Sequence, residues 1–360
     1  MKNTFGQSIT LTLYGESHGS AIGAVLDGIA PGIKVDEAFI AQQLTLRRPA
    51  GKISTPRAER DPFVIESGVF GGYTTGTPIC IRIPNGDTRS GDYEPRAARP
   101  GHADYAAFCK YHGHEDYRGG GHFSGRITAA VVAAGAILID ALRQKGVLIG
   151  THLARVGGVA DRGFEDLKKD IESVNGKLFA VLDETKVEAM QQAILSAKVD
   201  GDSVGGVLES AIVGLPAGVG EPFFDSLESR LAHALFSIPA VKGVEFGDGF
   251  ALADMRGSQS NDAMQAAEGG AVLQSGHAGG IFGGISVGAP IVVRTAVKPT
   301  PTIGKTQQTV TLPTLENTQM AGKGRHDPCI VHRARVVADS LIALTLADML
   351  AMRFGTDWMA

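Results

Sequence analysis

The sequence predicts an α+β fold in which long buried helices form a layer against antiparallel strands. Two segments, 124–144 and 331–352, are apolar on most faces, which is typical of helices buried on all sides. Short strand-like runs are scattered along the chain and do not alternate cleanly with helices. No strand leads through a G-x-G-x-x-G turn into a helix, which argues against a doubly wound dinucleotide-binding fold.

Each expected element has a local reason. Strands are expected where apolar residues alternate or form a short run between turn residues. Asp36 and Asp225 are suitable N-caps for the helices that follow them. In chain order we expect strands at 9–14 and 21–26, a helix at 37–46, strands at 64–69 and 79–83, a helix at 124–144, a strand at 147–156, surface helices within 161–195, a strand at 204–213, a helix at 225–236, an irregular segment at 243–249, a strand at 285–295 and a helix at 331–352.

Length, charge and cysteine content narrow the class of protein. The 360 residues carry a net charge of −4, so the basic excess typical of nucleic-acid-binding and membrane-surface proteins is missing. The three cysteines lie far apart without a C-x-x-C pair, which indicates neither a disulfide framework nor a thiolate zinc site. We see no secretory signal and no apolar run of about 18 residues. We therefore expect one cytoplasmic domain over 1–360, with neither nucleic acid nor membrane as a partner.

The segment 99–126 is the strongest candidate for a functional site. It holds four of the ten histidines among glycines, arginines and aspartates, and we expect a long loop without secondary structure of its own. Imidazoles for proton transfer, guanidinium groups for anions and glycines for close backbone approach together indicate an active site. Its last part, GGGHFSGR, precedes a helix and is either an anion site built from backbone N–H groups or a turn capped by Ser124.

Other motifs have a functional and a plain structural interpretation. RRPAGKISTPRAER could bind a small polyanion or be a solvated basic loop. GESHG has the letters of a nucleophile elbow, but a strand follows it, so a hairpin turn or an imidazole at a glycine-lined pocket fits better. HGHED does not match a zinc-binding helix, and we expect no metal. A metal-dependent phosphohydrolase and a polyanion-binding protein remain alternative functions.

Taken together, the motifs resemble those of the chorismate synthase family. FGQSITLTLYGESHG, RRP, DYRGGG, GLPAGVGEP, AVKGVEFGDGF, RGSQSND, HAGGIFGG, KPTPT and GKGRHDP occur in the family's order over essentially the whole chain. The resemblance implies a β-α-β sandwich, with long central helices between two antiparallel sheets, assembled as a homotetramer. It also implies a carbon–oxygen lyase of the shikimate pathway, which makes chorismate by anti-1,4-elimination of phosphate from 5-enolpyruvylshikimate 3-phosphate for aromatic amino acid biosynthesis.

The resemblance assigns roles to matching positions. His18 would assist phosphate departure, His102 would balance charge on the reduced flavin, and Asp327 would transfer a proton at flavin N5. The expected substrate-binding cations are Arg47, Arg48, Lys52, Arg126 and Arg325. The expected flavin contacts are His122, Phe123, Ser124, Pro239, Ala240, Gly283, Lys298, Pro299, Thr300, Pro301, Thr302 and Arg325. Many members have other residues at His122, Phe123 and Pro239, and only contacts through backbone carbonyls survive such changes.

The implied cofactor is reduced FMN (FMNH2), although the elimination has no net redox change. Positions assigned to NADP in the family align with Arg47 and Lys52, and the same two cations would serve a substrate phosphate equally well. The chain has neither a Rossmann fingerprint nor a large insertion that would add a reductase. We therefore expect NADPH to act at most as an indirect electron source, through an external flavin reductase.

Overall fold

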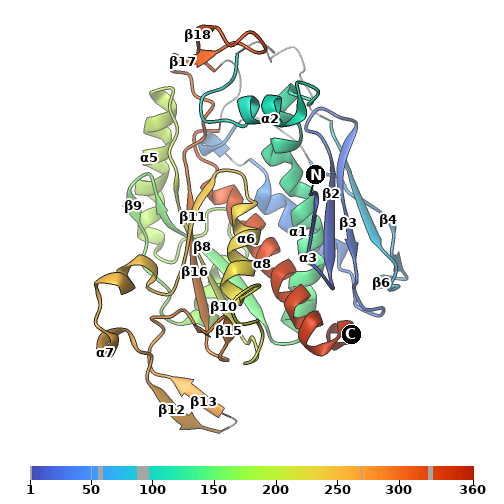
Figure 1. Ribbon diagram of the computed structural model, residues 1–360, viewed down its shortest axis with the longest axis vertical. Helices are drawn as coiled ribbons and strands as arrows, with labels where there is room; N and C mark the ends of the chain where they lie inside the picture. Colours follow the sequence, from blue (N-terminus) through green and yellow to red (C-terminus); the bar gives the residue numbers. More distant parts are fainter. Residues whose placement is uncertain (1, 50, 56–59, 87–96, 269, 323–326) are drawn as a thin grey trace.

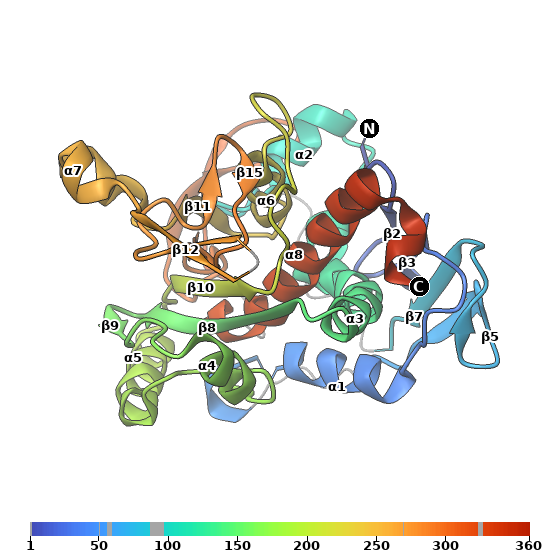
Figure 2. The same ribbon diagram turned by 90° about the horizontal axis from the view of Figure 1, so that it is seen from below.

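The structure is a computed structural model that describes residues 2–49, 51–55, 60–86, 97–268, 270–322 and 327–360. Two antiparallel sheets enclose a layer of helices (Figures 1 and 2). The first sheet has the order β1 (Thr4–Phe5), β2 (Thr10–Gly15), β3 (Ala21–Asp27), β7 (Ile79–Pro84) and β4 (Val64–Ser67). The second has the order β11 (Val241–Phe246), β16 (Ile291–Val297), β10 (Gly206–Val213), β8 (Leu148–Val156) and β9 (Val159–Ala160). The predicted β-α-β sandwich is confirmed.

Helices α1 (Glu37–Arg47), α3 (Thr128–Gln144) and α8 (Val331–Phe354) form the middle layer. α3 packs on the first sheet, and α8 packs on the second (Figure 1). The two helices approach each other closely at Gly135, because a Cβ atom there would lie 2.3 Å from Cβ of Ser340. By length and composition Gly125–Gln144 could cross a membrane, but 83% of its most apolar window is buried within the protein, as in a core helix.

Asp348, near the end of α8, ties the N-terminus of the chain to the core. Its buried carboxylate accepts hydrogen bonds from the backbone N–H groups of Gln7, Ser8 and Ile9 at 2.7–3.1 Å. It also forms an ion pair with Arg230 on α6 (Leu227–Phe236). A buried carboxylate is stable only when it is paired and hydrogen-bonded in this way. The first strands are therefore held by the last helix.

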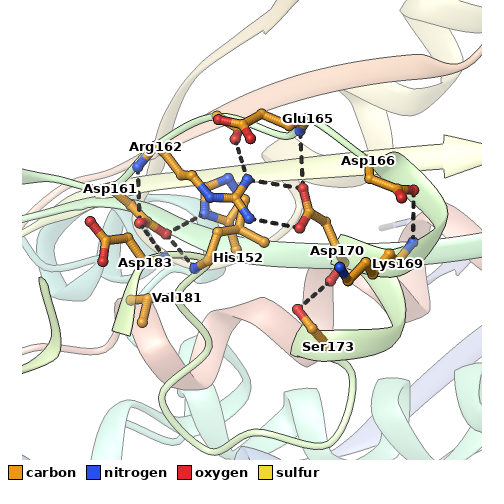
Figure 3. A network of polar contacts seen from close by, with 12 residues as sticks. His152, Asp161, Arg162, Glu165, Asp166, Lys169, Asp170, Ser173, Val181 and Asp183 are labelled. Carbon is orange, nitrogen blue, oxygen red and sulfur yellow. Dashed lines mark hydrogen bonds and ion pairs between the residues drawn. The ribbon is translucent and has the colours of Figure 1, made fainter. Parts of the chain in front are cut away.

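Helices α4 (Leu167–Val174) and α5 (Val187–Val199) lie on the face of the second sheet opposite α8 (Figure 2). His152 of β8 is buried on this face, and its two ring nitrogens each lie 3.0 Å from a carboxylate, of Asp161 and of Glu209. The cluster around His152 is drawn in Figure 3. Burial alone would lower the pKa of His152, but the two carboxylates outweigh it and raise the pKa. Both ring nitrogens face a carboxylate acceptor, an arrangement that stabilises the protonated ring.

Smaller elements complete the chain. Two short helices are α2 (Asp104–Tyr111) and α7 (Gly257–Ser260). Four hairpins are formed by β5 (Val69–Phe70) with β6 (Tyr73–Thr74), β12 (Met264–Ala267) with β13 (Gly270–Leu273), β14 (Ile281–Phe282) with β15 (Ile285–Ser286), and β17 (Gln307–Val310) with β18 (Asn317–Met320). The 3₁₀ turns are Gly51–Ile53, Arg118–Phe123, Gly125–Ile127, Glu184–Lys186, Gly249–Asp254 and Thr356–Met359. β12, β13 and α7 project from the body of the molecule (Figure 1).

Four expectations about elements were wrong, each for a local reason. The strand expected at 64–69 is divided into β4 and β5, because Gly68 turns the chain with a φ of 84°. The segment 99–126 contains helix α2 and a 3₁₀ segment, because its glycines gather after residue 112 and leave 104–111 free of helix breakers. Segment 243–249 was expected to be irregular, but residues up to Phe246 belong to β11, where a register shift next to Gly243 keeps the pairing with β16. The strand expected at 285–295 is divided into β15 and β16, because Gly288 turns the chain with a φ of 81°.

The N-cap of α6 also differs from the expectation. Asp225 has a φ of 59°, in the left-handed region, whereas an N-cap residue needs an extended backbone. Ser226 takes the role, and its side chain accepts a hydrogen bond from the N–H of Ser229. The N-cap predicted for α1 is confirmed, because Asp36 accepts from the N–H groups of Ala38 and Phe39.

Candidate active site

A cavity of about 1010 Å³ lies between the layers, at the N-terminal ends of α3 and α8. Sites for small molecules usually occupy about 300–1000 Å³, so this cavity is at the upper end of that range. Among the residues singled out from the sequence, those that line it are Arg47, His102, His122, Phe123, Ser124, Arg126, Pro239, Ala240, Lys298, Thr300, Pro301, Thr302 and Asp327. The structure thus gathers predicted residues from five separate stretches of the chain.

Five other predicted residues do not line the cavity, and one lies outside the described residues. His18 is buried behind the cavity wall, next to Gly119. Gly283 lies in the turn between β14 and β15. The residues not found on the cavity wall are His18, Arg48, Lys52, Gly283 and Pro299, and the residue outside the described part is Arg325.

Glycines place the backbone between the two predicted catalytic imidazoles. Gly119 and Gly120 have positive φ values of 60° and 83°. A Cβ atom on Gly119 would lie 2.1 Å from Cε1 of His18, and one on Gly120 would lie 3.2 Å from Cε1 of His102. Side chains at these positions would displace the rings, so the GGG sequence is needed for close approach. His122, one residue further, is held by a 2.8 Å hydrogen bond between Nδ1 and the carbonyl oxygen of Gly15.

His102 belongs to a fixed triad of polar side chains. Its Nδ1 lies 2.7 Å from Oδ1 of Asp104, and Arg99 binds the same carboxylate through Nε at 2.8 Å and Nη2 at 2.7 Å. Burial would raise the pKa of Asp104, but hydrogen bonds from Arg99 and His102 hold that pKa far below its usual range. Nδ1 of His102 lies closer to the ionised Asp104 than to Nη2 of Arg99, which is 3.1 Å away, so a proton on Nδ1 is shared with Asp104. Nε2 is then the nitrogen that can exchange a proton.

Cations converge at the end of the cavity formed by α1 and the start of α3. Arg47 and Arg126 are buried, line the cavity and share the carboxylate of Asp61. Arg48 lies further away, with Nε 3.8 Å from Asp61. Nε of Arg47 has no hydrogen-bond partner within the described ranges. A buried donor without a partner is costly, so this nitrogen suits a ligand with anionic oxygens.

Asp327 lies on the cavity wall in an ion pair. Its Oδ1 accepts from the N–H of Thr55 at 2.7 Å, and its Oδ2 is bound by Arg333 of α8. Arg333 also donates from Nε to the carbonyl oxygen of Arg47 at 2.9 Å. Each carboxylate oxygen therefore has a partner, which fixes the orientation of Asp327 on the cavity wall.

The segment 298–302 closes one side of the cavity. Nζ of Lys298 donates to the carbonyl oxygen of Gly101 at 2.6 Å, and its backbone N–H donates to Ala240 at 2.9 Å. The side-chain oxygen of Thr300 is buried and has no hydrogen-bond partner in the part of the chain that the structure describes. A cation, an unsatisfied hydroxyl and the apolar side chains of Val131, Leu341 and Leu344 all line this cavity, and these kinds of group fit a flavin with a phosphate tail.

Sequence reasoning missed Asp61 and Arg333, and it noted Arg99 only as a neighbour of His102. Arg333 stands two residues into a helix expected to be buried, and an arginine at such a position is a usable signal. Asp61 had no comparable signal, since it follows a loop rich in charge. As for metals, no group of three or more His, Cys, Asp or Glu suited to an ion occurs among the residues described.

Comparisons with known proteins agree with the geometry. A family model described as chorismate synthase matches residues 9–351. The chain is 44% identical to a chorismate synthase of Korarchaeum cryptofilum, over 96% of both chains. It is 46% identical to one of Methanosarcina barkeri, over 96% of this chain and 95% of that protein. A crystal structure of a chorismate synthase superposes with a TM-score of 0.75 at 30% identity, covering 98% of this chain and 94% of the other.

Proposed function

Since the chain belongs to the chorismate synthase family of carbon–oxygen lyases, we propose that it converts 5-enolpyruvylshikimate 3-phosphate to chorismate and phosphate with reduced FMN. The observation that supports this most strongly is the convergence of Arg47, Arg126 and His102 on one cavity. A 1,4-elimination from a substrate with two carboxylates and a phosphate needs clamps for anions and a carrier for protons. The wall of the cavity offers groups of both kinds.

The chain's own residues would divide the work as follows. Arg47 and Arg126 bind anionic oxygens of the substrate and orient the ring. His18, which lies behind Gly119 and off the cavity wall, would act on the charge of the departing phosphate across this glycine. His102 holds a proton at Nε2, and Asp104 fixes its orientation. Asp327, whose carboxylate Arg333 orients, takes part in proton transfer.

The residues beside the 298–302 segment would hold the cofactor. Lys298, Thr300 and Thr302 would bind its phosphate, while Pro239 and Ala240 would contact its ring together with 122–124. Reduced FMN, when bound, supplies a reversible source of an electron, which accounts for a reductant in a redox-neutral elimination.

We further propose a homotetramer in the cytoplasm, supplied with reduced flavin by an external reductase. NADPH would then act only as an indirect electron source. Arg47 is buried and engaged by Asp61, and Lys52 does not line the cavity, so we assign Arg47 to the substrate rather than to NADP.

An anaerobic assay tests the proposed function. The protein is mixed with chemically reduced FMN and the enolpyruvyl substrate, and chorismate and phosphate are measured together. We expect both products in equal amounts, and none when the flavin is oxidised. Absence of turnover under strict reduction would defeat the proposal. Phosphate release that needs no flavin and stops with a chelator would favour a metal-dependent phosphohydrolase instead.

A further inference from the structure

Asp61 lies beneath the cationic end of the cavity without touching the cavity itself. Its side chain is 0% exposed. Oδ2 lies 2.8 Å from Nη2 of Arg47, and Oδ1 is bound by Nη1 of Arg126. The two arginines come from different elements, α1 and the 3₁₀ turn before α3, and both line the cavity. One carboxylate therefore joins two cations that face the ligand space.

The environment of Asp61 keeps its carboxylate ionised. Burial alone would raise its pKa, but Arg47 and Arg126 outweigh this effect and lower the pKa. Its backbone has a φ of 48°, in the left-handed region that non-glycine residues rarely adopt. Such strain persists where the surroundings over-determine it, and it is concentrated at functional sites.

The hydrogen bonds of the two arginines show what Asp61 contributes. Arg126 donates from Nε to Asn85 at 3.0 Å and from Nη2 to the carbonyl oxygen of Pro84 at 3.1 Å. Arg47 has fewer anchors: apart from Asp61, its guanidinium donates only to the carbonyl oxygen of Gly125, at 3.5 Å, among the residues described. Without Asp61, the guanidinium of Arg47 would lose its one short contact. Its orientation thus depends on this carboxylate.

We propose that Asp61 is a positioning residue, which holds the guanidinium groups of Arg47 and Arg126 in the geometry that binds an anionic group of the substrate. The identity of that substrate rests on the proposed function, but the binding of an anion at this place does not. Charge and positioning make opposite predictions here. Removing a negative charge next to an anion site should tighten anion binding, whereas releasing the arginines should weaken it.

Inorganic phosphate is the probe that separates these two effects. Its dissociation constant is measured by titration calorimetry for the wild-type protein, for Asp61→Asn and for Asp170→Asn. Asp170 is the matched control, because it is a buried carboxylate bound to Arg162 at 2.7 and 2.9 Å, on the face of the second sheet remote from α8. We expect Asp61→Asn to weaken phosphate binding by about tenfold or more, as loss of a charge-assisted contact commonly does. Asp170→Asn should leave it unchanged.

Two further variants keep the test sharp if Asp61→Asn folds poorly. Asp61→Glu preserves the charge and moves the oxygens by one methylene group. If Asp61 acts by positioning, this variant binds phosphate more weakly than wild type. If only its charge matters, the phosphate affinity does not change. The double variant Arg47→Gln with Asp61→Glu should lose less phosphate affinity than the sum of the two single variants, because part of the effect of Asp61 passes through Arg47. Phosphate binding by Asp61→Glu or Asp61→Asn that equals or exceeds wild type overturns the proposal.

Turnover measured in parallel separates this proposal from the proposed function. If wild-type protein makes chorismate and the Asp61 variants keep the same KM and phosphate affinity, the positioning role of Asp61 is refuted and the proposed function is not. Wild-type protein that makes no chorismate refutes the function, while weaker phosphate binding in the variants still supports the positioning role. We expect KM for the substrate to rise in Asp61→Glu by a larger factor than kcat falls.

Discussion

Gly135 lies where α3 crosses α8, and replacing it with alanine tests how closely these helices pack. The new Cβ atom would lie 2.3 Å from Cβ and 2.7 Å from Cα of Ser340. Carbon atoms in contact prefer a separation of about 3.5–4.0 Å, so the methyl group would be too close by roughly 1 Å. A rotamer change of Ser340 moves neither of these atoms, and the helices must separate instead.

The magnitude follows from two opposing effects. Overpacking a core typically costs about 1–3 kcal/mol, and a clash with main-chain atoms belongs at the upper end. Alanine is a better helix former than glycine by about 1 kcal/mol. The difference predicts that Gly135→Ala lowers the free energy of unfolding by about 2 kcal/mol. At an exposed helical position, the same substitution would raise it.

Urea denaturation followed by circular dichroism measures this change. The double variant Gly135→Ala with Ser340→Gly is the matched control, because it removes the Cβ and hydroxyl that the new methyl group would meet. We expect it to be less impaired than the sum of its two single variants. A Gly135→Ala protein as stable as wild type, or more stable, would refute the reasoning, since it would mean that the helices have room between them.

Three further predictions concern the site and the second sheet. His18→Ala and His102→Ala should each lower kcat by about 10² or more, the usual scale for general acid–base groups, with the fold intact by circular dichroism; wild-type rates in both would show that the chemistry lies elsewhere. Asp104→Asn should lower kcat about tenfold or more and alter the pH–rate profile, because an amide no longer fixes which nitrogen of His102 holds the proton; an unchanged profile contradicts this. The pKa of His152 is raised in the folded protein. Its protonation therefore contributes fully to stability below the pKa of the unfolded chain, about 6.5, and this contribution is lost as pH rises through the pKa of the folded protein. The urea midpoint of wild type should therefore fall at alkaline pH, and that of His152→Gln should fall less. Equal decreases in the two proteins would contradict a raised pKa of His152.

Much of the architecture could be predicted because burial leaves a strong pattern in the sequence. The helix 128–144 is apolar on nearly every face, and the helix 331–354 has a long apolar part, which is typical of helices buried on all sides. β11 escaped prediction because its glycine suggests a turn, whereas pairing with β16 decides its conformation. Local propensity does not contain such tertiary pairing.

Many residues of the cavity wall could be singled out from the sequence one by one, but their arrangement could not. Histidine, arginine and glycine clusters indicate anion binding and proton transfer wherever they stand. That Arg47 and Arg126 share Asp61 depends on how α1 and α3 pack, and no local pattern shows it. The same applies to His18, which reaches Gly119 only because the first hairpin lies beside the 3₁₀ segment.

The position of α8 has a consequence for how the chain folds. The helix follows the strands of both sheets in the sequence, and its Asp348 binds residues that lie between the first two strands. The first sheet has α3 as a cover before α8 is added, whereas the inner face of the second sheet relies mainly on α8. The second sheet therefore completes its core only when α8 docks, and a variant without this helix should expose the apolar face of that sheet.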